Sequence, residues 1–191
     1  LKMSFSASTD DGSASSATYG MDNHFAFGGT YVTDLGDSAV TVGFGYSDSD
    51  GAKTGTQMTA DEGGVHVGVS AVTGDLTVAV GFADGDSIES VTASTPASEV
   101  DGEVVKVGAK YVSGDLTFNV GVTSGNAHDN SFAGTDRSGE DSVETTSASV
   151  SYAVASGVTA ILGYSNTESQ NEGAADDKDG SAWYIGANMS F

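Results

Sequence analysis

The chain has 191 residues, of which 38% are hydrophobic and 27 are Gly, so a conventional hydrophobic core is hard to build from it. Six Lys plus Arg against 27 Asp plus Glu give a net charge of −21, which excludes a nucleic-acid partner because phosphate binding needs clustered cations. The absence of Cys excludes disulfides and thiolate chemistry, and the lack of any apolar run of about 18 residues excludes a transmembrane helix but not membrane-spanning strands.

Four segments along the chain carry bulky apolar residues at alternate positions on both sides of a short turn. In residues 62–84, for example, Val65, Val67 and Val69 alternate with small or polar residues, and the pattern resumes after the turn. Each turn contains a Gly, usually followed by Asp, which supplies the positive φ that a tight hairpin requires. The four predicted turns lie at Leu35-Gly36-Asp37, Gly74-Asp75, Ser113-Gly114-Asp115 and Ser156-Gly157.

The hairpins are separated by connections rich in Asp, Ser, Gly and Thr. Together with a strand in residues 1–8 and a terminal strand ending at Phe191, they predict about ten strands in a single domain covering 1–191. Short turns on one side and long loops on the other are typical of outer-membrane barrels. The long acidic loops are predicted near 9–21, 48–61, 84–102, 125–142 and 166–180.

Two architectures fit this alternation of bulky and small residues. In a membrane barrel the bulky set faces lipid, whereas in a water-soluble sandwich it lines the interior. Aromatic residues near strand ends and the near confinement of charges to loops favour a transmembrane antiparallel up-and-down β-barrel, because an aromatic belt marks the membrane interface. These aromatic residues are Tyr46, Phe82, Tyr111, Tyr152, Tyr164 and Trp183.

The chain resembles the C-terminal part of the Gram-negative outer-membrane general porins, most closely those of alphaproteobacteria. The resemblance rests on the terminal strand, on the hairpins around Ser-Gly-Asp-Leu-Thr, and on motifs such as Val42-Gly43-Phe44-Gly45-Tyr46 and Ile161-Leu162-Gly163-Tyr164-Ser165. It implies a sixteen-strand barrel and a homotrimer, with these strands the last ten and a segment holding the constriction loop preceding them. A barrel of ten strands that closes alone is the alternative.

The terminal strand is the most specific part of the resemblance. In the porin family, a final Phe preceded by apolar residues at alternate positions resembles the signal that the outer-membrane assembly machinery reads. The resemblance therefore implies that this machinery and the lipid of the outer membrane are partners of the chain. The implied assembly signal comprises Trp183, Ile185, Met189 and Phe191.

Lys106 and Lys110 share one face of a predicted strand and lie among the small and polar positions. We expect them to line the lumen, and His66, Asn119 and Thr117 belong to the same inward set. The alternative is that these are ordinary polar residues that only hydrate the wall. Their effect on selectivity should be mild, because rings of like charge dominate ion selection.

The acidic loops predict a collar of carboxylates at the outer mouth, which would raise the local cation concentration. Its candidate members are Asp48, Asp50, Asp176, Asp177 and Asp179. Neither Asp-rich segment fits an EF-hand, so we predict no metal site and no cofactor, with weakly bound calcium in the loops as the alternative. The simplest interpretation is a solvated, extended loop.

No catalytic motif is present, and His24, His66 and His128 are scattered, so the sequence does not predict an enzyme. We expect a passive diffusion channel of the bacterial outer membrane that carries small hydrophilic solutes and ions with a preference for cations. The alternative is a non-channel surface protein, either a small closed barrel serving adhesion or an acidic extracellular β-module that binds calcium.

Overall fold

The computed structural model describes residues 1–9, 21–51, 61–89, 98–131, 140–171 and 177–190. All regular structure in these residues is β-strand, and no helix long and apolar enough to cross a membrane occurs among them. The strands are β1 (Lys2–Thr9), β2 (Met21–Leu35), β3 (Ser38–Gly51), β4 (Asp61–Thr73), β5 (Leu76–Glu89), β6 (Ser98–Ser113), β7 (Leu116–Ser131), β8 (Glu140–Ala155), β9 (Val158–Gln170) and β10 (Lys178–Met189).

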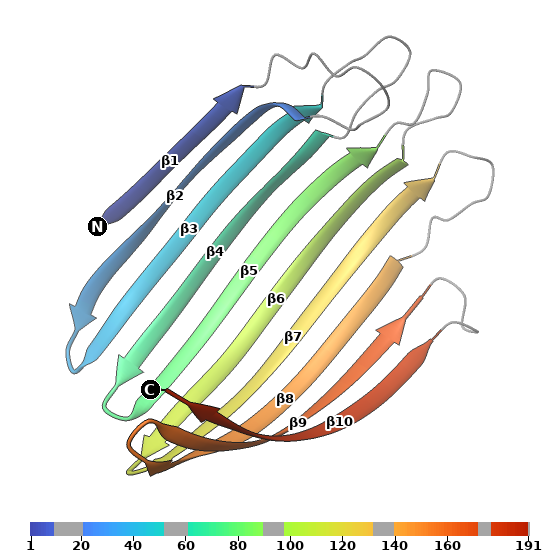
Figure 1. The fold of residues 1–191 in the computed structure, drawn as a ribbon. Coiled ribbons are helices and arrows are strands. Elements are labelled where there is room, and N and C mark those ends of the chain that lie inside the picture. The colour runs from blue at the N-terminus through green and yellow to red at the C-terminus, as the bar shows by residue number, and fades with distance from the viewer. Residues whose placement is uncertain (10–20, 52–60, 90–97, 132–139, 172–176, 191) are drawn as a thin grey trace.

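The ten strands form one antiparallel sheet in which each strand pairs with its neighbour in sequence (Figure 1). This meander confirms the predicted all-β, up-and-down fold and the predicted number of strands. Within the described residues, β1 pairs only with β2 and β10 only with β9, so the sheet has two open edges. The strands therefore form a curved wall that is not closed.

Two-residue turns join the strands at one end of the sheet, where the sequence predicts them. Gly36 between β2 and β3 has φ 63°, and Gly74 and Gly114 occupy the same place in the next hairpins with φ 56° and 58°. Only Gly adopts this left-handed region without steric cost. Gly157 has φ 76° as the second residue of the turn between β8 and β9.

At the other end, several strands extend further than expected. β5 continues to Glu89 and β6 begins at Ser98, inside the predicted loop 84–102, and β7 continues to Ser131 inside the predicted loop 125–142. Alternating polarity marks only the part of a strand whose two faces meet different environments. Beyond that part, polar residues pair through the same backbone bonds without leaving a pattern in the sequence.

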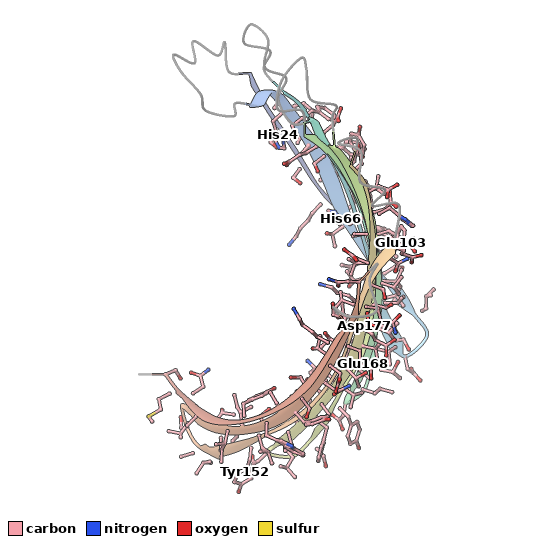
Figure 2. The ribbon with its side chains drawn as sticks, turned by 90° about the vertical axis from the view of Figure 1, so that its right-hand side faces the viewer. His24, His66, Glu103, Tyr152, Glu168 and Asp177 are labelled. Atoms are coloured by element: carbon pink, nitrogen blue, oxygen red, sulfur yellow. The ribbon has the colours of Figure 1, made fainter. Side chains whose placement is uncertain are left out.

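The sheet curves strongly, so that it has a concave and a convex face (Figure 2). His66 lies on the concave side, and Glu103 and Tyr152 lie on the convex side. Because successive residues of a strand point to opposite faces, the register assigns the remaining side chains. The bulky apolar set lies on the convex face, where Val107 and Val120 are 53% and 57% exposed.

Glycines on the concave face let two strands approach closely. Gly64 of β4 lies directly opposite Gly85 of β5. A Cβ added at Gly85 would lie 2.9 Å from the carbonyl oxygen of Gly63, and one added at Gly64 would lie 3.0 Å from that of Asp84. Both neighbours are backbone atoms of the ladder, so they can move away only if the strand pairing is disturbed.

We therefore predict that Gly85→Ala lowers the free energy of unfolding by about 1–3 kcal/mol, the usual cost of overpacking. Gly81→Ala is the matched control on the same strand and face, because its nearest atom, the carbonyl oxygen of Val67, would lie at 3.8 Å. The control should change stability by no more than about 0.5 kcal/mol. Urea unfolding in detergent micelles measures both variants, and equal effects would contradict the prediction.

Candidate functional site

The concave face carries the five residues that we expected to line a lumen. Lys106 and Lys110 lie on one face of β6. Lys110 pairs directly with Asn119 of β7. His66 pairs with Ala83 of β5, and Ala83 pairs with Val104 of β6, which is two positions before Lys106. Thr117 pairs with Val112, two positions beyond Lys110, so all five share the concave face. Their role as pore-lining residues stays a prediction.

Lysines in the described strands are confined to this face. Lys2 and Lys106 belong to one row of directly paired residues that crosses from β1 to β6, and Lys178 belongs to the row of His66. None of the lysines in the described residues has an ion-pair partner among those residues. The row of Lys106 runs through Lys2, Thr30, Gly43, Gly68, Gly81, Lys106, Thr123, Thr145 and Thr167.

The wall between β1 and β6 is hollowed. A depression of about 890 Å³ is lined by Lys2, His66 and Lys106, and by Gly28, Gly43, Gly45, Gly68 and Gly81. The imidazole of His66 crosses to β3 and covers Gly45, where an added Cβ would overlap the ring. Glycine thus serves two purposes here, because it leaves backbone exposed to the hollow and makes room for the ring.

The concave face changes character beyond β6, where hydroxyl and amide groups become frequent between glycines such as Gly121 and Gly163. Asn119 donates from Nδ2 to the Oγ of Ser149 at 3.3 Å, and the hydroxyls of Thr145 and Thr167 are 3.0 Å apart. Apart from Asp141 and Lys178 at the long-loop end, the polar groups of this half are neutral hydrogen-bonding groups, which a hydrated solute can contact at low cost in free energy. Its hydroxyl members include Thr117, Thr123, Thr145, Ser147, Ser149, Ser151, Ser165 and Thr167.

Tyr184 is a concave-face residue that the sequence analysis did not select. It lies directly opposite Gly163, and its phenol ring crosses to β9, where a Cβ at Gly163 would overlap it. The side chain is 50% exposed. The sequence did contain a feature that could have identified Tyr184. It is a bulky aromatic residue among the small and polar positions of the last strand, next to Trp183 of the bulky set.

The convex face carries an apolar band with aromatic residues and acids at its border. Phe82 is followed two positions later by Asp84, and Tyr46 in the same way by Asp48. Tyr31, Tyr111 and Tyr152 lie toward the short-turn end. The described acids on this face are Asp48, Asp84, Asp86, Asp101, Glu103, Glu140, Glu144, Glu168 and Asp179.

The register shows on which face two members of the expected acidic collar lie, while their role at an outer mouth stays a prediction. Asp48 follows Tyr46 by two positions, and Asp179 precedes Trp183 by four positions. Residues an even number of positions apart on a strand share a face, so both acids lie on the convex face and not on the concave one. Asp177 precedes β10, and its Oδ1 accepts a hydrogen bond from the backbone N–H of Asn171 at 3.1 Å.

For two further acids of the expected collar, the structure does not assign the side chain to a face. Asp50 pairs with Asn23 in the ladder, but its side chain is outside the described set, and Asp176 lies outside the described residues. Among the described residues, no three His, Asp or Glu side chains gather in a way that could hold a metal ion. His128 instead lies 4.0 Å from Glu140 on the convex face.

The predicted assembly signal lies on the edge strand. Trp183, Ile185 and Met189 occupy alternate positions of β10 and are 72%, 86% and 57% exposed, while Phe191 lies outside the described residues. The Trp183 ring packs against Tyr164, with the ring centroids 4.8 Å apart. The alternation of bulky apolar residues with small or polar ones therefore continues to the end of β10 at Met189.

Comparison with known proteins extends these observations. Among solved structures, the chain is similar to the outer-membrane expressed OmpT of Vibrio cholerae, with 15% sequence identity and a TM-score of 0.57 over 92% of this chain. The chain spans 62% of the length of that protein, and the likeness concerns the fold alone. A search of curated proteins gave no match.

A match to a protein family covers most of the chain. Residues 1–172 match the family of Gram-negative porins, which fits the curved meander, the apolar convex face and the polar concave face. The match does not separate bacterial classes, so the likeness to alphaproteobacterial porins stays a prediction. The chain therefore belongs to the Gram-negative porin family and is a protein of the bacterial outer membrane.

Proposed function

We propose that the protein is a passive diffusion channel for small hydrophilic solutes and ions, and that it works without catalysis. The observation that carries this proposal is the division of side chains between the two faces of the curved sheet. The convex face carries an apolar band that suits lipid, whereas the concave face carries many Gly, Ser and Thr residues and the lysines and suits water. We also propose that further strands pair with β1 and β10, because unpaired backbone groups are costly in lipid.

The proposed preference for cations depends on two opposing charge distributions. The net charge of −21 favours cations at the outer mouth over about a Debye length, roughly 8 Å. Lys106 and Lys110 oppose this on the wall, since a unit charge 8 Å away in water contributes about 0.5 kcal/mol, a factor of about two in local ion concentration. We propose that the acidic mouth outweighs the wall lysines and that the preference for cations is modest.

We predict that the reconstituted protein gives salt-gradient potentials of cation-selective sign in planar bilayers. Lys106→Gln should raise the cation-to-anion permeability ratio by a factor of up to about four, because removing one wall cation changes the local cation and anion concentrations by about twofold in opposite directions. Lys53→Gln, a change of equal charge in a predicted outer loop, serves as the control for general surface charge. Potentials of anion-selective sign in the unchanged protein would contradict the preference.

A second prediction tests which face meets lipid. Ala148→Lys places a charge on the convex face of β8, and we expect it to destabilise the bilayer-inserted protein by about 2–4 kcal/mol if it lies near the midplane. Ser147→Lys, one residue earlier and on the concave face, should cost less than about 1 kcal/mol because water solvates it. Folding into lipid vesicles as a function of urea measures both, and a larger cost for Ser147→Lys would reverse the assignment.

We further propose that the protein forms a homotrimer and that the assembly machinery reads Trp183, Ile185, Met189 and Phe191. The exposed alternate residues of β10 support this proposal, because an edge strand with one apolar side is available to a partner.

Deletion of Phe191 should therefore reduce the amount of folded protein in the outer membrane, while Asn188→Ala on the opposite face should not. The measurement is the heat-dependent mobility shift of the barrel in gels of isolated outer membranes. Unchanged amounts of the shifted form after deletion of Phe191 would rule out its role in assembly.

A further inference from the structure

One row of the concave face combines a cation, a hydrogen-bonded amide and an aromatic ring. The row crosses β6 to β10 through Lys110, Asn119, Ser149, Gly163 and Tyr184. It spans four strand spacings of about 4.8 Å, or roughly 19 Å between its outer Cα atoms. Because barrel strands tilt by about 35–45°, a row perpendicular to them runs obliquely along the pore axis.

The two ends of the row offer different chemistry. Lys110 is exposed, and no anionic side chain among the described residues pairs with it. At the other end, the half-exposed ring of Tyr184 lies across Gly163 and so reaches back toward Ser149. An aromatic ring held against the sheet offers apolar surface with a polar tip, and an ammonium group attracts a carboxylate.

The middle of the row offers neutral hydrogen bonds. Within the described residues, Asn119 bonds only with Ser149, so its amide oxygen and its second N–H remain for a solute. The hydroxyls of Ser147 and Ser151 lie two positions from Ser149 on the same face. A hydroxylated ring placed here would exchange its bonds to water for bonds to these groups.

We propose that this row is a weak binding track for carboxylated sugars such as hexuronates. The sugar ring packs on Tyr184, its hydroxyls bond with Asn119 and Ser149, and its carboxylate lies toward Lys110. This proposal rests on the proposed channel function and names a solute class for it. The row lies apart from the hollow beside Lys2, His66 and Lys106, because only residues on β6 and beyond contribute to it.

The test is the interruption of ion current through the reconstituted full-length protein by added glucuronate, with glucose and acetate as comparison solutes. We expect saturable interruption by glucuronate, weaker interruption by glucose, and none by acetate. Lys110→Gln should weaken glucuronate binding by about threefold to fivefold, as expected for an exposed ion pair, and leave glucose unchanged. Tyr184→Leu should weaken both sugars, while Tyr184→Phe retains the ring and should retain glucose binding.

Lys178→Gln is the matched control, since it removes the same charge from the same face but outside the row. An equal loss of glucuronate binding in Lys178→Gln and Lys110→Gln would show general electrostatic attraction and overturn the track. A conducting channel whose current glucuronate does not interrupt would also overturn it while leaving the channel proposal intact. A folded protein that conducts no ions would instead contradict the channel function itself.

Discussion

The pleat of the β-strand, which sends successive side chains to opposite faces, governs the whole molecule. In a curved sheet this alternation becomes a division between two environments, and every position must suit one of them. The bulky apolar residues of β4 to β7 lie on the convex face, whereas most of their sequence neighbours on the concave face are small, apart from residues such as His66, Lys106 and Lys110. A one-residue slip of any strand would exchange the two sets, so the pairing register is strongly determined.

Charge follows the same division. The lysines of the described strands lie on the concave face. Most of the described acids of the strands lie on the convex face beyond the aromatic border, as Asp84 does beyond Phe82, while Asp34, Glu62 and Asp141 lie on the concave face. A charge is costly in hydrocarbon but inexpensive beside water. The overall charge of −21 therefore does not describe the concave face alone, because much of the acidic character lies elsewhere on the molecule.

Glycine determines how closely the strands and the rings can pack. Gly64 and Gly85 bring two backbones together, and Gly45 and Gly163 leave room for His66 and Tyr184 to lie flat along the sheet. Rings held over glycines cover backbone that would otherwise face solvent, which compensates in part for the low strand propensity of Gly. Many glycines of the described strands thus belong to the concave face, whereas Gly36, Gly74, Gly114 and Gly157 lie in the tight turns.

The sequence by itself determined which residues share a face of one strand, such as Lys106 and Lys110, and where the tight turns lie, because both depend on neighbours a few positions apart. It did not determine how far β5 and β7 continue, since polar pairing outside the alternating region leaves no periodic signal. The face on which Asp48 and Asp179 lie could have been predicted from the sequence. Each is an even number of positions from an aromatic residue of the bulky set, Tyr46 or Trp183. Only the tertiary structure placed Lys2 in the row of Lys106 and Tyr184 over Gly163, because the register between strands is set by many paired residues acting together.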